Sequence, residues 1–113
     1  MTGDWLFFTG KEVTVRQIAD ALGDCEMEIW DDAGVLEIPL GDKTSMDFEA
    51  ASIHPKDEVT RAFAVAHGAE QVFLVTFPPE DYGRAEALMK QILSGLPGLF
   101  CGDTEDLQPR LEK

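Results

Sequence analysis

The residues of this sequence best suited to chemistry are its carboxylates, and they gather in one segment. Residues 20–42 contain eight acidic side chains and neither Lys nor Arg. These acids are Asp20, Asp24, Glu26, Glu28, Asp31, Asp32, Glu37 and Asp42. Carboxylates held close together can attract a cationic partner, hold a hard metal ion, or serve as a general acid and base. Their placement by the fold decides between these uses.

Alternation of apolar and polar residues places several of these acids on a three-stranded meander. A four-residue turn at 31–34 pairs Glu28 with Glu37, and a three-residue turn at 41–43 pairs Glu37 with Asp47. The three carboxylates then form one row, with Cβ atoms about 4.5–5.5 Å apart, a separation at which like charges destabilise a sheet. We therefore expect the row to lower the stability of the fold. The strands of the meander are expected over residues 25–30, 35–40 and 45–50.

The same parity places an aromatic side chain among the acids. The other residues expected on this outward face are Glu26, Trp30, Val35, Pro39 and Glu49. The functional interpretation is a partner-binding surface on which Trp30 is the apolar anchor and Glu26, Glu28, Glu37, Asp47 and Glu49 attract Lys or Arg. The alternative is a solvated sheet face with Trp30 covering the end of the hairpin. A register slip of one residue, or a bulge at Pro39, would break the row.

No metal-binding motif accompanies the acids. The segments 31–34 and 103–106 lack the ligand spacing of a calcium-binding loop, and the chain has no P-loop, GxGxxG, GxSxG or HExxH motif. The three acids of the row remain an alternative site for Mg²⁺ or Ca²⁺. We assign no metal ligand, no cofactor and no catalytic residue from the sequence.

The cysteines and histidines have structural interpretations. Cys25 shares parity with inward-facing residues and is expected in the core, whereas Cys101 would be a nucleophile only with a base beside it. His54 precedes a proline at an expected helix start, and His67 falls in the last turn of the same helix, where a protonated ring would interact favourably with the helix dipole.

The elements that position these residues follow the order β-α-β-β-β-α-β-α-β. Thr14 and Gln17 have the spacing of a capping box, and the unbroken apolar run 71–77 predicts a central strand. We predict a single α+β domain over residues 1–113, with one mixed, mostly antiparallel sheet and helices packed mainly on one face. Helices are expected over residues 14–22, 55–67 and 78–95, and the other strands over 5–8, 71–77 and 99–101, before an acidic tail.

Composition excludes several classes of partner. The chain has 113 residues, with 22 Asp and Glu against 9 Lys and Arg, for a formal charge of −13. That charge repels nucleic acid and anionic lipid, and the sequence has no basic patch to offset it. No apolar run approaches the ~20 residues of a membrane span, and the first nine residues have no basic region of a signal peptide. The two cysteines form no disulfide framework, so a reduced, cytoplasmic protein is expected.

Three classes of function fit these observations. The first is a non-enzymatic interaction domain that engages a basic protein partner, comparable with small acidic inhibitor or immunity-type proteins in charge and size alone. The second is a small enzyme or ligand-binding domain that uses the carboxylate row or a pocket between sheet and helices. The stretch 77–83 is interpreted as a plain connection between a strand and a helix, with a mobile loop over a site as the alternative. The third is a structural homodimer formed through a sheet edge or through Trp5, Phe7 or Phe8.

Overall fold

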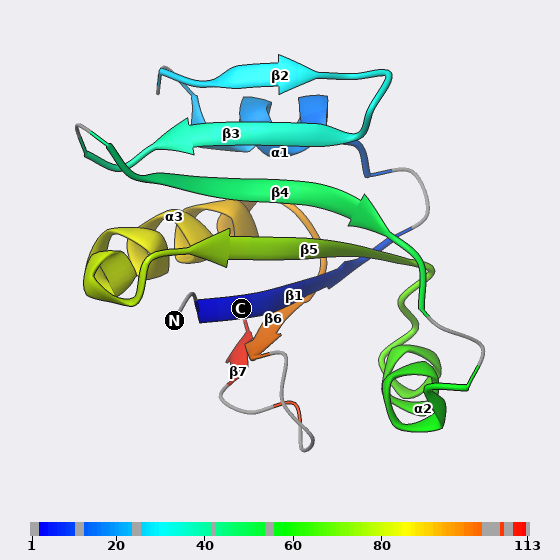
Figure 1. Cartoon of the computed structure of the whole chain (residues 1–113). Helices are drawn as coiled ribbons and strands as arrows, with labels where there is room; N and C mark the ends of the chain where they lie inside the picture. The colour runs from blue at the N-terminus through cyan, green and yellow to red at the C-terminus, as the bar shows by residue number, and fades with distance from the viewer. Residues whose placement is uncertain are drawn as a thin grey trace.

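The computed structural model describes residues 3–10, 13–23, 26–41, 43–53, 56–102, 107 and 110–112. Within them the chain forms one seven-stranded sheet and three α-helices, as drawn in Figure 1. The strands are β1 (Gly3–Thr9), β2 (Glu28–Trp30), β3 (Val35–Pro39), β4 (Ser45–Ala51), β5 (Gln71–Phe77), β6 (Leu99–Gly102) and β7 (Arg110–Glu112). The helices are α1 (Val15–Leu22), α2 (Glu58–Ala66) and α3 (Tyr82–Gly95), and the 3-10 helix η1 (Pro79–Asp81) directly precedes α3.

The strand order in the sheet is β2-β3-β4-β5-β1-β6-β7. Every strand pair in the described part of the chain is antiparallel. The predicted α+β class is therefore confirmed. The run 71–77 forms β5, which lies between β4 and β1 in the middle of the sheet, as its continuous apolar character predicted.

Helix α1 begins where its capping box predicts. The hydroxyl of Thr14 accepts a hydrogen bond from the backbone N–H of Gln17 at 3.3 Å, and the Gln17 side chain accepts one from the Thr14 N–H at 3.0 Å. These two bonds satisfy donors that a helix start leaves unpaired. The helix ends at Leu22, before Gly23, which has a φ of 73°.

Helix α2 is shorter than the predicted range 55–67. It begins at Glu58 because Asp57 acts as its cap, accepting hydrogen bonds from the backbone N–H of Thr60 at 3.1 Å and from the Thr60 hydroxyl at 2.7 Å. Its last residue is Ala66. His54 and Pro55, which were expected at the helix start, lie outside the described residues.

The helices divide between the two faces of the sheet. Helices α1 and α3 pack on one face, which Figure 1 shows behind the strands, and their buried side chains form a core with Phe7 and Phe48. Helix α2 packs on the opposite face, where Ala64 and the partly buried Phe63 contact the cluster that contains Phe8. Because neighbouring residues of a strand point to opposite faces, Phe7 and Phe8 belong to different clusters. Two of the three helices thus share one face, as predicted.

The end of the chain contains a strand that the sequence did not predict. An acidic tail was expected after Cys101, but β7 pairs with β6 and places Arg110 opposite Cys101. Leu107 is buried against the α2 face of the sheet, and the guanidinium of Arg110 lies 4.7 Å from the ring centre of Phe63. A three-residue strand has too little alternation to stand out in a sequence. In the described part of the chain, no helix has the length and apolar character needed to cross a membrane.

Candidate functional site

The predicted register of the meander is confirmed by the strand pairing. Glu28 lies opposite Glu37 in the β2–β3 pair, and Glu37 lies opposite Asp47 in the β3–β4 pair. Trp30 lies opposite Val35, next to the turn. The three carboxylates therefore form the expected row, and no slip or bulge interrupts it.

Gly34 explains why the hairpin meets β4 in this register. Its carbonyl accepts a hydrogen bond of 2.8 Å from the backbone N–H of Ala50, so the turn itself is tied to β4. Its φ is +67°, and a Cβ built on it would lie 2.8 Å from the Cβ of Ala50. A side chain at this position would be both strained and too close to its neighbour, so glycine fits the position best.

The row extends beyond the meander. Asp47 lies opposite Thr76 of β5, and Thr76 lies opposite Asp4 of β1. One line of side chains, four of them acids, thus crosses five strands; at about 4.8 Å per strand it spans roughly 19 Å. Asp4 and Thr76 were not predicted as members of the site. The alternation within β5 and β1 could have indicated them, but only once β5 is known to pair with β4 and β1 with β5.

We call the outward surface of β2, β3 and β4, with its continuation at Thr76 and Asp4, the acidic face. Trp30 is 45% exposed on it, an unusual exposure for a large aromatic side chain. Glu28 and Glu49 are exposed, and Glu37, Asp47 and Val35 are half-buried. The Ser45 hydroxyl donates a hydrogen bond of 2.9 Å to Asp47. Among the described residues, no Lys or Arg forms an ion pair with Glu28, Glu37 or Asp47.

Glu26 and Pro39 were predicted on the outward face, outside the row. Strand β2 begins only at Glu28, so Glu26 precedes it, and both Glu26 and Pro39 line a groove of about 400 Å³ that α3 also lines. Since β2 does not reach Pro39, this residue has no β2 partner and lies at an edge, where a missing backbone N–H is tolerated. Cys25, expected in the same strand, lies outside the described residues.

One cation of α1 binds the hairpin turn. Arg16 of α1 forms an ion pair of 2.6 Å with Asp31 in the turn. The hydrogen bond from Arg16 to Asp31, and then the negative charge of Asp31, raise the pKa of Arg16 further above its ordinary value. Both side chains are about half exposed, so this pair contributes little to stability. Its effect is to join the turn to α1.

The stretch 77–83, considered as a mobile cover, forms η1 and the first turn of α3. Three rings pack together there: Tyr82 stacks on Trp5 with ring centres 5.9 Å apart, and Phe77 lies 6.3 Å from Trp5. The Tyr82 hydroxyl donates a hydrogen bond of 2.8 Å to Glu86. This packing supports a structural connection between β5 and α3.

The Tyr82–Glu86 pair gives a prediction on pH. The hydrogen bond from Tyr82 is the largest cause that lowers the pKa of Glu86, followed by the charge of Lys90. A lowered carboxyl pKa adds stability that is present above the ordinary carboxyl range and is lost as pH falls through the folded-state value. In Tyr82→Phe we expect the pKa of Glu86 to rise toward its ordinary value, measured by NMR titration of the carboxyl carbon.

Lys90→Gln is the comparison variant, because it removes the charge of Lys90 and leaves the Tyr82 hydrogen bond in place; it should also raise the pKa of Glu86. An unchanged Glu86 titration in Tyr82→Phe would contradict the assignment. Tyr82 itself has a raised pKa, first from burial and then from Glu86, so its contribution to stability should be lost at alkaline pH as the phenol ionises.

The alternative chemistries find little support in the geometry. Among the described residues, no three His, Cys, Asp or Glu side chains are placed to hold a metal ion. Cys101 is fully buried in β6, where a thiol behaves as a small apolar group. His67 caps the C-terminus of α2 and packs on Phe63, with ring centres 4.3 Å apart.

The dimer contacts proposed from the sequence are corrected by burial. Trp5, Phe7 and Phe8 are 6%, 0% and 1% exposed, because each belongs to a packed cluster on one face of the sheet. Their side chains cannot contact a second copy without unfolding. Of the dimer surfaces considered, only the outer strands β2 and β7 remain.

The acidic face is therefore a flat array of oxygen acceptors beside one exposed indole ring. It matches a surface that supplies cations and one apolar contact. No family model, no curated protein and no solved structure matches this chain, so its function has to be inferred from this geometry alone.

Proposed function

We propose that this chain is a non-enzymatic interaction domain whose acidic face binds a basic surface of another protein. The observation that carries the proposal is the row Glu28, Glu37 and Asp47, whose members lie directly opposite one another without a basic side chain from the described chain between them. Like charges in this position destabilise the sheet, so a partner that neutralises them would bind favourably. An inhibitor or immunity-type role is the closest analogy in charge.

The spacing of the row favours a helical binding element on the partner. Carboxylates on adjacent strands repeat at about 4.8 Å across the sheet. Lys or Arg residues three and four positions apart on a helix have Cβ atoms about 5–6 Å apart, a close match. Side chains on one face of an extended strand repeat at roughly 6.8 Å and match less well. We therefore expect a basic helix that lies across β2, β3 and β4.

Trp30 supplies the apolar part of the proposed surface. It lies beside Glu28 along β2, two residues away on the same face, and opposite the half-buried Val35. Exposed aromatic residues next to a charged rim are typical centres of binding energy in protein interfaces. The charges would then speed association, while burial of Trp30 would slow dissociation.

The test begins with capture of a partner at low salt. The proposal is supported if substitutions on the acidic face weaken the binding of that partner. Trp30→Ala should weaken binding by about 2 kcal/mol, or roughly thirtyfold in Kd, mainly through faster dissociation. Glu37→Gln should slow association and flatten its dependence on salt. Surface plasmon resonance at two salt concentrations measures both effects.

Matched controls come from elsewhere on the surface. Val65→Ala removes an apolar side chain that is 79% exposed on α2, and Glu80→Gln removes an exposed acid of η1. Neither should change the Kd by more than a few fold. The proposal fails if folded Trp30→Ala and Glu37→Gln proteins bind the partner as tightly as the parent at both salt concentrations.

A further inference from the structure

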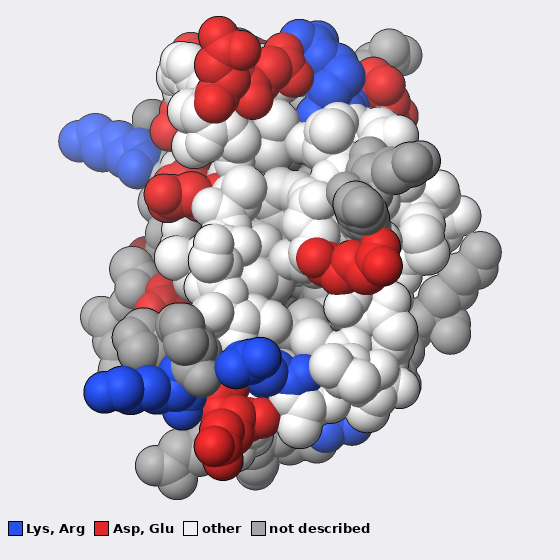
Figure 2. Space-filling view, turned by 90° about the vertical axis from the view of Figure 1, so that its right-hand side faces the viewer, with Lys and Arg blue, Asp and Glu red and all other residues white. Residues whose placement is uncertain are grey.

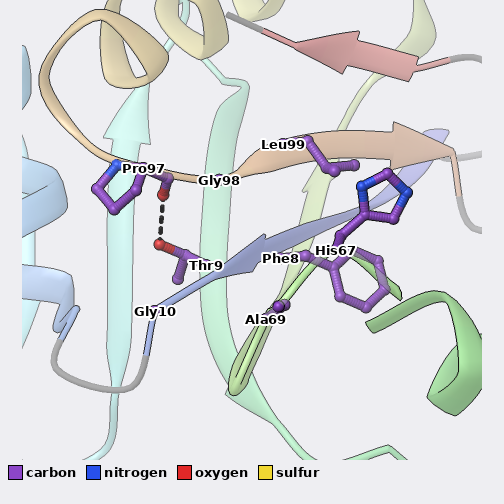
Figure 3. A pocket seen from close by; sticks show the side chains of 9 residues that line it. Phe8, Thr9, Gly10, His67, Ala69, Pro97, Gly98 and Leu99 are labelled. Carbon is purple, nitrogen blue, oxygen red and sulfur yellow. Dashed lines mark hydrogen bonds between the residues drawn. The ribbon is translucent and has the colours of Figure 1, made fainter. Parts of the chain in front are cut away.

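A cavity of about 470 Å³ lies at one end of the sheet, away from the acidic row. Three segments distant in sequence line it: residues 8–10 at the end of β1, residues 67–69 after α2, and residues 97–99 before β6. Figure 3 shows Thr9 and Pro97 at one side of the cavity and His67 with Leu99 at the other. The volume is within the range of small-molecule sites in proteins.

The walls of the cavity are fixed by internal contacts. The Thr9 hydroxyl, 2% exposed, donates a hydrogen bond of 2.6 Å to the Pro97 carbonyl, and the Thr9 carbonyl accepts one of 3.1 Å from Glu70. At Gly98 a Cβ would lie 2.3 Å from the Phe8 carbonyl oxygen, so only glycine lets this segment approach β1 so closely. The site is thus formed before any ligand arrives.

The chemistry of the walls disfavours an anion. Among the residues that the structure describes, no Lys, Arg, Asp or Glu lines the cavity. The backbone N–H groups of Gly68 and Ala69 donate to the carbonyls of Val65 at 3.1 Å and Ala64 at 2.8 Å, so neither is free to bind an anion. These residues follow the C-terminus of α2, where the helix dipole places partial negative charge.

The same features favour a cation. Residues 97–99 follow the C-terminus of α3, so the ends of two helices contribute to the walls. The chain as a whole has a charge of −13, which adds attraction for positive ligands. Figure 2, which views the end of the molecule where β1 ends, shows uncharged surface with an acidic group near its middle and further charged groups above and below. A ligand there would meet a wall in which polar atoms predominate, with one imidazole ring.

We propose that this cavity binds a small planar organic cation, such as an aryl amidinium or a protonated aromatic amine. The imidazole of His67, which packs on Phe63 with ring centres 4.3 Å apart, offers a flat surface at one side of the cavity, and Gly10 leaves room at the other. Backbone carbonyl oxygens accept hydrogen bonds from the cation. This site is independent of the acidic face and does not rest on the proposed function.

The test uses three probes of nearly equal shape and different charge: benzamidine, benzamide and benzoate. In NMR titrations of the full chain, benzamidine should shift the amide signals of Gly10, Gly68 and Gly98, and it should bind at least about tenfold more tightly than benzoate. Shifts confined to Trp30 and Glu37 would mean adsorption on the acidic face and would overturn the proposal. Equal binding of benzoate, or no binding of benzamidine, would also overturn it.

Two variants and one control locate the bound probe. At Gly10 the backbone φ is not positive and a Cβ would meet no atom within 4 Å, so Gly10→Leu should fold and fill part of the cavity. Gly83→Leu is the matched control, since Gly83 has the same freedom but lies in α3. Gly10→Leu and His67→Ala should each weaken benzamidine binding at least about tenfold, and Gly83→Leu should not. Parent-like binding by both cavity variants would refute the site.

Discussion

Phe7→Ala is expected to lose about 3–5 kcal/mol of its free energy of unfolding, the usual cost of removing a fully buried phenylalanine. Phe7 is 0% exposed and lies between the strands and helices of the larger core. Its ring stacks on Phe100 with centres 4.4 Å apart and contacts Phe73 at 6.2 Å and Phe48 at 6.5 Å. Truncation would leave a void among these rings, which sit on four different strands with Phe7.

The measurement is urea unfolding followed by tryptophan fluorescence and by circular dichroism. Val65→Ala, at a position 79% exposed on α2, is the control and should change stability by less than about 0.5 kcal/mol. A loss below about 1 kcal/mol in Phe7→Ala would contradict the packing described for this ring. If residues 1–113 form one domain, as we propose, both signals should give one transition that reductant does not move.

The hairpin register could be predicted because it depends on local information. Two turn lengths, at 31–34 and 41–43, and the alternation in the flanking strands determine which residues face each other. The row Glu28, Glu37 and Asp47 follows from these alone. The start of α1 was predictable for the same reason, since the capping box of Thr14 involves only the three residues that follow it.

The rest of the acidic face depends on contacts between distant segments. Thr76 and Asp4 join the row because β4 pairs with β5 and β5 with β1, and nothing in the local pattern specifies those neighbours. The run 71–77 was expected to be buried on both faces, yet Thr76 is half-buried because α2 covers only part of that face. Strand neighbours of this kind are set by the packing of the whole sheet.

The cavity could not be predicted from the sequence for a similar reason. Its walls come from residues 8–10, 67–69 and 97–99, and only the folded sheet brings these three segments together. Its glycines resemble ordinary turn residues in the sequence. The two candidate sites therefore differ in origin. The row of the acidic face follows from the alternation of apolar and polar residues in neighbouring strands, whereas the cavity forms where three distant segments meet at one end of the sheet.

Gly98→Ala is expected to destabilise the protein by about 3 kcal/mol or more, although the substitution adds only one methyl group. The added Cβ would lie 2.3 Å from the Phe8 carbonyl oxygen and 2.9 Å from a ring carbon of Phe7. The φ of Gly98 is +137°, a conformation that residues with a side chain rarely adopt. Relief of both problems requires the segment before β6 to move away from β1.

Gly10→Ala is the matched control, because Gly10 lines the same cavity but has neither a positive φ nor an atom within 4 Å of its would-be Cβ. It should be neutral or slightly more stable than the parent, by up to about 1 kcal/mol, since alanine restricts the unfolded chain. Urea unfolding of both variants measures the difference. Equal stability of Gly98→Ala and Gly10→Ala would show that β6 can shift at little cost. The Thr9–Pro97 hydrogen bond joins this segment to β1 and forms part of the cavity wall. If β6 does shift, folded Gly98→Ala should therefore no longer bind benzamidine.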